Sequence, residues 1–281
     1  MKLLTLNTHS LQETNYSLKL DQFVSVIKEE QPDILALQEV NQSMDAPPAD
    51  SDLLSAWVPC PDSVPIRNDN HGAQTALRLR KMGIPCSYTR ISAKIGYGKY
   101  DEGMALFSLN HKITEVHSFF ISGCRDYDNW KTRRVLGIRT DASDDWFYTA
   151  HMGWWQDEEE PFSAQWNRLN NALQPKKENG TVWLMGDFNS PSQFRGQGYD
   201  QILESGWADT YELASEKDSG ITVEGCIDGW KSYYDSTEAP KGMRIDHIWC
   251  SHPVSVKRSR VLFNGNQEPK VSDHFGVMIE I

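Results

Sequence analysis

One short stretch of the chain, LMGDFNSPS at residues 184–192, decides the fold that the sequence predicts. The apolar residues that lead into it predict a buried strand. We expect that strand to stop at Gly186, because glycine permits a sharp turn or a close approach to a ligand. Pro191 cannot continue a strand, so Asp187 and Asn189 are expected at the strand end, facing the same side. A carboxylate and an amide directed into one space suit a hydrated divalent cation beside a phosphate, and an Asx turn that closes the strand is the alternative.

The overall composition is that of a soluble globular protein. The 281 residues, 39% apolar and 24% charged, suffice for one large domain or two small ones. Because no repeat or obvious linker interrupts the chain, a single domain spanning 1–281 is expected. The formal net charge of −11 argues against a dedicated nucleic-acid binder, which neutralises phosphates with a basic face. Ten tryptophans indicate aromatic surfaces beyond those that a core requires.

The cysteines and the N-terminal sequence bear on the cellular compartment. The five cysteines are odd in number and far apart, and no C-x-x-C spacing occurs, so neither a zinc site nor a disulfide framework is predicted. The first residues, MKLLTLN, enter a strand pattern directly and lack the apolar region and cleavage site of a signal peptide. Because no stretch approaches the ~18 consecutive apolar residues of a membrane span, we expect a cytoplasmic protein with no membrane partner.

The beginning of the chain predicts a strand–helix–strand crossover. Residues 2–8 and 33–40 are apolar runs typical of buried strands, and residues 18–30 carry apolar side chains at helical spacing. Residues 41–72 are rich in Asp, Pro and Ser and predict a long irregular segment. Loops of this length are uncommon unless they are functional.

The rest of the chain predicts a mainly β protein with a few helices. Helices are expected at 73–82, where Gly83 would end the helix, at 162–173 and at 199–204. Residues 215–242 are expected to be mostly loop. Strands are expected at 87–93, 102–109, 113–121, 135–140, 146–151, 181–185, 245–250, 254–263 and 275–281, with a loop at 96–101.

Polar residues gather where the predicted buried strands end. The clusters are Asn7, Gln38-Glu39, His151, Asp187 with Asn189, Arg244-Ile245-Asp246-His247 and Ser272-Asp273-His274. A core cannot leave so many charges unpaired, because burying one bare carboxylate costs several kcal/mol. Catalytic groups held at the edge of a rigid sheet are a common arrangement. These residues are therefore candidates for catalysis rather than for packing.

Seven blocks, spread from one end of the chain to the other, carry a resemblance to a known superfamily. They are LTLNTHS at 4–10, LALQEV at 35–40, EGMALFS at 102–108, TAHMGWW at 149–155, LMGDFNSPS at 184–192, RIDHIWCS at 244–251 and VSDHFGV at 271–277. In this order they resemble the endonuclease/exonuclease/phosphatase superfamily of metal-dependent phosphoesterases, which includes pancreatic-type deoxyribonuclease, abasic-site endonucleases, inositol polyphosphate phosphatases and bacterial sphingomyelinases. The resemblance implies an α/β fold: a four-layer α/β/β/α sandwich of two packed, mostly antiparallel sheets flanked by helices, with the active site at one edge.

The resemblance also implies a metal site. Glu39 would be the principal Mg²⁺ ligand, with Asn7 beside it and Asp273 as a further carboxylate on the metal side. Mn²⁺ would be a possible substitute. Mg²⁺ typically takes only one or two carboxylates and keeps several waters, which fits this small set of ligands.

The same resemblance implies roles in handling phosphate and protons. Asp187 and Asn189 would orient the attacking water and the phosphate. His274 would contact the phosphoryl group or act as a base, steered by Asp246, because a neighbouring carboxylate commonly fixes the tautomer of an imidazole. A surface turn charge is the alternative for Asp246.

A second histidine completes the implied site. His151 would assist the leaving group or bind a phosphate oxygen, and a satisfied interior histidine is the alternative. In deoxyribonuclease-like members a Glu on a neighbouring strand steadies this histidine, and Glu102 stands at the matching place, with a simple strand-end charge as its alternative. Together the set implies phosphoester hydrolysis, in which a metal polarises the phosphoryl oxygen and the histidines handle protons.

Aromatic residues near the blocks bear on the choice of phosphoester. Trp154 and Trp155 follow His151 closely, and His9 and Trp130 lie near other blocks. Sugars present flat apolar faces that stack on indole rings, so these residues favour a small sugar phosphate as the substrate. Packing between the sheets is the alternative for the two adjacent tryptophans.

A basic run precedes the predicted strand at 135–140. Lys131, Arg133 and Arg134 lie in the loop that leads into it. The guanidinium group is well shaped for bidentate contact with phosphate, so the two arginines are predicted to bind substrate. A solvated basic turn is the alternative.

Within the superfamily, the segments LTLNTHS, GKYDEGMALFS and HMGWW are most similar to cytosolic bacterial members that act on phosphorylated disaccharides, the maltose 6′-phosphate phosphatase type. That resemblance implies a phosphomonoesterase acting on a phosphorylated sugar. A nuclease or repair endonuclease with the same metal centre stays open, because the acidic balance disfavours nucleic acid without excluding it. A non-catalytic binding module is disfavoured by the intact acidic and histidine residues.

Overall fold

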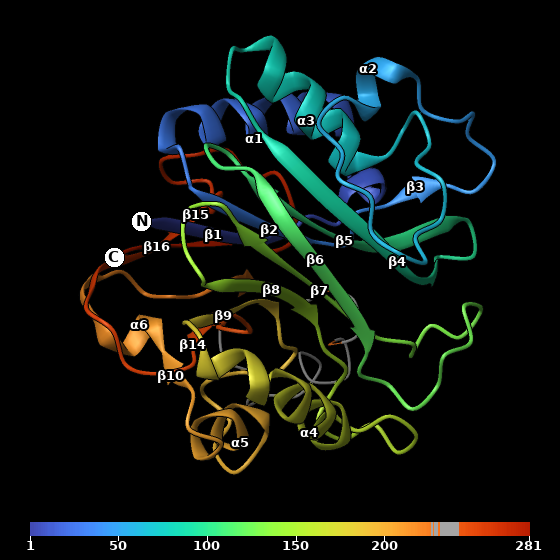
Figure 1. Ribbon diagram of the computed structural model, residues 1–281. Helices are drawn as coiled ribbons and strands as arrows, with labels where there is room; N and C mark the ends of the chain where they lie inside the picture. The colour runs from blue at the N-terminus through green and yellow to red at the C-terminus, as the bar shows by residue number, and fades with distance from the viewer. Residues whose placement is uncertain (226, 228–229, 231–241) are drawn as a thin grey trace.

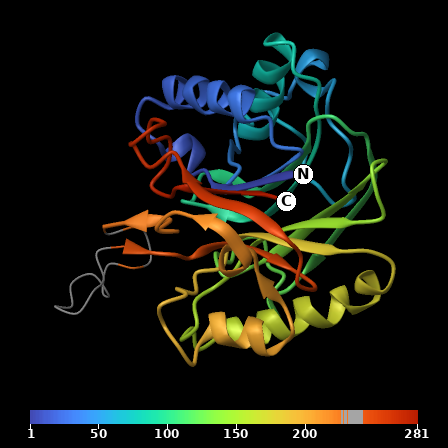
Figure 2. The same ribbon diagram turned by 90° about the vertical axis from the view of Figure 1, so that its left-hand side faces the viewer.

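Two β-sheets lie face to face in the centre of the molecule, and helices cover both outer faces (Figure 1). The computed structural model describes residues 1–225, 227, 230 and 242–281. Figure 2, the same ribbon turned by 90°, shows the sheets between two helical layers. The expected four-layer α/β/β/α sandwich with two mostly antiparallel sheets is confirmed.

The helices divide between the two outer layers (Figure 1). One layer contains α1 (Tyr16–Glu30), α2 (Ser51–Leu54) and α3 (His71–Lys81), and the other contains α4 (Phe162–Leu173) and α5 (Gly198–Glu204). Shorter turns are η1 (Ser10–Gln12), η2 (Gln174–Glu178) and α6 (Thr210–Leu213). Of the helices in the described parts of the chain, none combines the length and the apolar character needed to cross a bilayer.

Each sheet mixes strands from distant parts of the sequence. The eight-stranded sheet contains β11 (Ala214–Lys217), β15 (Val256–Leu262), β16 (Gly276–Glu280), β1 (Lys2–Asn7), β2 (Ile34–Gln38), β5 (Tyr100–Ser108) and β3 (Gln42–Ser43) in that order, with β4 (Ser87–Gly96) paired to β5. The six-stranded sheet has the order β10 (Ala208–Asp209), β14 (Asp246–Cys250), β9 (Val182–Asp187), β8 (Trp146–His151), β7 (Arg134–Thr140) and β6 (Ile113–Phe120). β12 (Val223–Glu224) and β13 (Gly242–Met243) pair antiparallel in a separate two-stranded sheet.

Strand alternation places the core on both sides of each sheet. In β2, Leu35 and Leu37 pack with α1 and α3, whereas Ile34 and Ala36 pack against the second sheet. Successive side chains of a strand point to opposite faces, so a strand that is covered on both faces is apolar throughout. On the far side, Trp166 of α4 lies in the cluster that covers the other face of the second sheet.

Most of the expected elements are confirmed, and one loop is corrected. The predicted loop at 96–101 is wrong, because β4 and β5 continue into it and leave a tight turn in which Tyr97 and Gly98 have positive φ values of 52° and 66°. The expected loop at 215–242 contains β12 and part of β11 and of β13. Within it, residues 226, 228–229 and 231–241 lie outside the described residues.

The strand of the opening stretch also runs further than predicted. β9 continues through Gly186 to Asp187 instead of stopping at the glycine. A Cβ on Gly186 would lie 2.0 Å from the carbonyl oxygen of Ala150 on β8, and the φ of Gly186 is +143°. The glycine therefore permits the close approach of β8 and β9, rather than ending the strand.

Candidate active site

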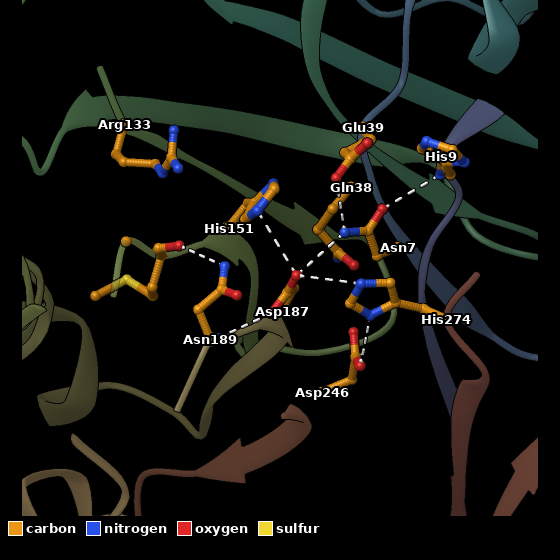
Figure 3. A network of polar contacts seen from close by, with 12 residues as sticks. Asn7, His9, Gln38, Glu39, Arg133, His151, Asp187, Asn189, Asp246 and His274 are labelled. Atoms are coloured by element: carbon orange, nitrogen blue, oxygen red, sulfur yellow. Dashed lines mark hydrogen bonds and ion pairs between the residues drawn. The ribbon is translucent and has the colours of Figure 1, made fainter. Parts of the chain in front are cut away.

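The ends of β1, β2, β8 and β9 bring the predicted polar residues together at one edge of the two sheets (Figure 3). β1 is parallel to β2 and β8 is parallel to β9, so the carboxyl ends of each pair coincide. Asp246, the first residue of β14, lies opposite Asp187 in the antiparallel pairing of β14 with β9. The sheet backbone therefore sets the positions of these side chains.

Asp187 is the centre of the polar network in Figure 3. Its Oδ2 accepts a hydrogen bond from Asn7 Nδ2 at 3.1 Å and lies 3.6 Å from His151 Nε2 and 3.8 Å from His274 Nε2. Burial, followed by the charge of Asp246, raises the pKa of Asp187 to about 6. One carboxylate thus stands between two histidines, with an affinity for protons suited to catalysis near neutral pH.

The sequence placed His274 with Asp246, and the structure brings the two side chains together. His274 Nδ1 lies 2.9 Å from Asp246 Oδ2, and Asp246 is fully buried. Burial lowers the pKa of His274, but Asp246 and Asp187 outweigh it and raise that pKa well above the ordinary value. His274 is therefore an imidazolium whose Nε2–H faces Asp187.

His151 has the opposite protonation state. Burial lowers its pKa well below the ordinary value, and the nearby charges of Arg133 and Lys94 add to the effect. The expected partner, Glu102, lies instead 3.1 Å from Lys94 Nζ, where it compensates an ammonium group that is 8% exposed. His151 is thus a neutral imidazole, and the assignment of Glu102 as its support is corrected.

The amide of Asn189 is engaged by the protein itself. Its Nδ2 donates to the carbonyl of Met152 at 3.0 Å and its Oδ1 accepts from Trp230 Nε1 at 3.0 Å. The backbone N–H of Asn189 donates to Asp187 Oδ1 at 2.8 Å, which is an Asx-type contact. The Asx turn that was the alternative for Asp187 and Asn189 is therefore present. It does not exclude a catalytic role, because Oδ2 of Asp187 still faces the polar cluster.

Glu39 has a carboxylate oxygen open to a cation, while two other groups of the described residues, His9–Glu13–Asp273 and Asp187–Asp246–His274, bring possible ligand atoms within 4.8 Å of one another. Glu39 follows β2 directly, with a positive φ of 51°. Its Oε1 accepts from Asn7 Nδ2 at 3.0 Å, while its buried Oε2 has no hydrogen-bond partner among the described residues. Burial, then the charges of Glu102 and Asp273, raise the pKa of Glu39 to about 7. A buried carboxylate oxygen without a partner, next to a second carboxylate, fits a hard divalent cation such as Mg²⁺.

Asn7 braces the acidic residues through its side-chain amide. Its Nδ2 donates to both Glu39 and Asp187, and its Oδ1 accepts the backbone N–H of His9 at 3.3 Å. The amide therefore holds two carboxylates of like charge close together. The role of Asn7 as a metal ligand stays a prediction.

His9 lies on the acidic side of the site and not in the expected substrate wall. Its Nδ1 is 2.8 Å from Glu13 Oε1 and 3.9 Å from Asp273 Oδ1. Burial lowers the pKa of His9, but the hydrogen bond to Glu13 and the charge of Asp273 outweigh it and raise that pKa to about 9. Sequence reasoning missed Glu13, although its spacing of four residues from His9 was a usable signal.

A cavity of about 220 Å³ opens beside this cluster. Its lining has an acidic and histidine end and an aromatic side, on which the rings of Trp130 and Trp154 lie 5.7 Å apart. The lining residues are Glu39, Lys94, Ile95, Gly96, Tyr97, Glu102, Trp130, Arg133, His151, Trp154, Asp187, Asn189, Ile227, Asp273 and His274. Lys94 and Tyr97 were not among the predicted site residues.

Of the two adjacent arginines, only Arg133 faces the cavity. It is 3% exposed, and among the described residues no carboxylate oxygen lies within 4.0 Å of its guanidinium group. Arg134 points the other way, donating to the carbonyls of Asp62 at 3.4 Å and Ser92 at 3.3 Å, because successive residues face opposite sides. Arg133 is a buried cation available to an anion, and the prediction for Arg134 is corrected.

Of the two adjacent tryptophans, one faces the cavity and the other does not. Trp154 lines the cavity, and its buried Nε1 has no hydrogen-bond partner among the described residues. Trp155 is not among the lining residues, since it packs on the core beneath α4 with its ring 6.3 Å from that of Phe162. The packing alternative therefore holds for Trp155, whose assignment to substrate binding is corrected.

Comparisons with known proteins agree with the fold. The sequence profile described as the endonuclease/exonuclease/phosphatase family matches residues 4–274. A structure of a protein of this family from Leptotrichia buccalis is 33% identical with a TM-score of 0.83, covering 100% of this chain and 99% of that one. None of the curated proteins searched matches the chain.

More distant structures show the fold alone. A mannosyl-6-phosphatase from Bacteroides thetaiotaomicron is 19% identical with a TM-score of 0.62, covering 100% of this chain and 98% of that one. TDP2 from Caenorhabditis elegans is 16% identical with a TM-score of 0.61, covering 99% and 95%. With the family profile matched over nearly the whole chain, the protein belongs to the endonuclease/exonuclease/phosphatase family and is a phosphoester hydrolase.

Proposed function

We propose that the protein is a Mg²⁺-dependent phosphomonoesterase that removes phosphate from a small sugar phosphate, with a disaccharide such as maltose 6′-phosphate as the leading candidate. One observation carries the proposal: the Trp130–Trp154 pair lies on the same small cavity as the acidic and histidine cluster. Phosphate would occupy the charged end, and a sugar face would stack on the indoles. A cavity of about 220 Å³ suits one small ligand rather than a duplex.

The residues of the charged end have separate tasks in this proposal. Glu39 and Asp273 would hold the divalent cation, and when bound it would polarise a phosphoryl oxygen and offset developing negative charge. Arg133, whose guanidinium has no carboxylate oxygen of the described residues within 4.0 Å, binds the non-bridging oxygens of the phosphate. Glu39 and Arg133 line the same cavity, so the ester would be oriented between the metal side and the guanidinium.

Proton handling follows from the two protonation states. Asp187 accepts a proton from the attacking water, since its pKa is raised to about 6 by burial and by Asp246. His274, an imidazolium held by Asp246, donates a hydrogen bond to the phosphoryl group. His151, a neutral imidazole whose Nε2 lies 3.6 Å from Asp187 Oδ2, would take up the proton from Asp187 and pass it to the oxygen of the leaving sugar, which departs as a neutral alcohol.

Two further observations support a monoester of a sugar over a nucleic acid. The net charge of −11 disfavours a long polyanionic substrate. The mannosyl-6-phosphatase from Bacteroides thetaiotaomicron is an example of sugar-phosphate hydrolysis on this fold, although its 19% identity carries only the fold to this chain.

The test is phosphate release from maltose 6′-phosphate, trehalose 6-phosphate, glucose 6-phosphate and an inositol phosphate, each with Mg²⁺ and with EDTA, beside nicking of supercoiled plasmid. The proposal predicts metal-dependent release from a disaccharide phosphate and no nicking. Cleavage of DNA alone, with a steep loss of activity as salt is raised, would contradict it and move the protein to the nuclease branch.

A further inference from the structure

Two loops form the aromatic side of the cavity. Residues 121–133 lead from β6 to β7 and carry Trp130, and residues 152–161 lead from β8 to α4 and carry Trp154. Trp130 is 51% exposed, so burial in a core does not fix its ring. Within its own loop, the carbonyl of Trp130 accepts a hydrogen bond from Arg133 Nη1 at 2.8 Å, so contacts between the two loops are needed only to orient its ring relative to Trp154.

An ion pair joins the loops beside the tryptophans. Lys131 Nζ lies 2.9 Å from Asp157 Oδ1, and these side chains are only 17% and 11% exposed. Lys131 Nζ also lies 3.1 Å from the far more exposed Glu159 and 5.4 Å from the centre of the Trp130 ring. The lysine therefore contacts the indole of its own loop and the carboxylate of the other loop at once.

Asp157 is rigidly placed relative to Trp154. The backbone N–H of Asp157 donates to the carbonyl of Trp154 at 3.4 Å, which closes a turn. Asp157 Oδ1 also accepts the N–H groups of Glu159 at 2.9 Å and Glu160 at 2.8 Å. A carboxylate with three donors on one oxygen is held in one orientation. The ion pair with Lys131 therefore restrains the backbone that carries Trp154.

The deeper part of the two loops is joined by a different contact. The carboxylate of Glu160 accepts the backbone N–H of Gly123 at 2.9 Å and that of Cys124 at 2.6 Å. The backbone of Arg133 is fixed separately, by its N–H to Ser122 Oγ at 2.8 Å. The base of the loops therefore does not depend on the ion pair. Nearer the rim, Arg133 Nη1 donates to the carbonyl of Trp130 at 2.8 Å and Trp154 packs on the cluster of Val223, Met243 and Ile245, so the ion pair adds to these contacts by joining the two rim segments to each other.

We propose that the Lys131–Asp157 ion pair is a specificity determinant: it positions Trp130 and Trp154, and so selects the group esterified to the phosphate without taking part in hydrolysis. The inference rests on the proposed function, because it assigns the sugar side of the same cavity. Lys131 and Asp157 are positioning residues, acting through the two indoles that contact the substrate.

The test compares Lys131→Met with Lys131→Arg, which keeps the charge. Kinetics are measured on the best sugar phosphate of the panel, and inorganic phosphate is used as a competitive inhibitor that occupies the phosphate end alone. Lys131→Met should raise KM for the sugar phosphate by about three- to tenfold, with kcat and the Ki of phosphate unchanged. Lys131→Arg should keep KM close to wild type.

A matched control breaks an ion pair away from the cavity. Arg139 on β7 lies 3.1 Å from Asp144, and Arg139→Met should leave both KM and Ki unchanged. An unchanged KM in Lys131→Met, or KM and Ki rising in parallel, would overturn the inference while leaving the phosphatase proposal intact. Absence of sugar-phosphate turnover in the wild-type enzyme would overturn both.

Discussion

The strand-end cluster and the aromatic loops lie on one cavity but are built by different physical means. The catalytic side chains leave β1, β2, β8, β9 and β14 at positions set by backbone pairing, as in the opposition of Asp246 and Asp187. The tryptophans stand on loops that are tied by side chains, among them Lys131 and Asp157. Hydrolysis requires catalytic side chains in a fixed geometry, which the paired strands supply. The preference for a leaving group can be altered by changing contacts between the loops, without moving those strands.

The largest effect is expected at the metal-binding end. Glu39→Gln removes the charge but not the volume of the side chain, so kcat should fall by about two to four orders of magnitude with the fold retained. Steady-state phosphate release with titrated Mg²⁺ and far-ultraviolet circular dichroism give the two readouts. Glu115→Gln, on the half-exposed strand β6, serves as the control. A folded, fully active Glu39→Gln protein would remove Glu39 from the metal site.

A somewhat smaller loss is expected when His274 loses its partner. Asp246→Asn removes the charge that keeps the pKa of His274 high, so the imidazolium is lost at neutral pH and kcat should fall about 10²-fold. The pH profile of kcat should then lose activity at lower pH than in the wild type. An unchanged profile would show that Asp246 only fills space.

Substitution of each adjacent arginine tests which of the two side chains binds the phosphate. Arg133→Met should raise KM for every phosphate ester, and the Ki of inorganic phosphate, by about ten- to fiftyfold, because a charged hydrogen bond to the phosphate is lost. Arg134→Met, whose guanidinium bonds to carbonyls away from the cavity, should leave both constants unchanged. Equal effects of the two substitutions would contradict the assigned orientation.

Metal binding should stabilise the protein in a pH-dependent way. The pKa values of Glu39 and Asp187, about 7 and about 6, lie above the ordinary values. A group whose pKa is higher in the folded state than in the unfolded state contributes stability below its unfolded pKa, and that contribution is lost as the pH rises through its folded pKa.

Without metal, the cluster therefore becomes destabilising between about pH 5 and pH 8, where its carboxylates ionise. Mg²⁺ should raise Tm by about 5 °C at pH 8 and hardly at pH 5, as thermal unfolding with Mg²⁺ and with EDTA would show. A larger rise at pH 5 would contradict the assignment.

The strand-end cluster was largely predictable from the sequence, and the loops were not. Apolar runs that end in polar residues locate Asp187, Asp246 and His274 at strand ends, and the order of the blocks supplies the fold. The sequence does not show which of two adjacent residues of the same type faces the cavity. Successive side chains point to opposite sides, and only the structure shows which side is which. Arg134 and Trp155 were misplaced for that reason.

The register of one hairpin explains the remaining error. Lys94 and Glu102 are opposite each other in the pairing of β4 with β5, where cross-strand neighbours of opposite charge attract. The pairing of Glu102 with His151 was implied by the resemblance to deoxyribonuclease-like members, and the loop predicted at 96–101 gave no sign of the register that pairs Glu102 with Lys94 instead. Contacts between the loops, such as Lys131 with Asp157, join residues 26 apart and leave no periodic signal.

The central claim is that the strand-end cluster carries out hydrolysis and the aromatic loops select the substrate. The most direct test of it is the ratio of kcat/KM for a sugar phosphate to kcat/KM for phenyl phosphate. The ratio is determined in the wild type, in Trp154→Ala and in Trp155→Ala. We predict that Trp154→Ala lowers the ratio about tenfold while phenyl phosphate turnover persists, and that Trp155→Ala lowers Tm but keeps the ratio. An unchanged ratio in Trp154→Ala, or an equal fall in both variants, would contradict the account.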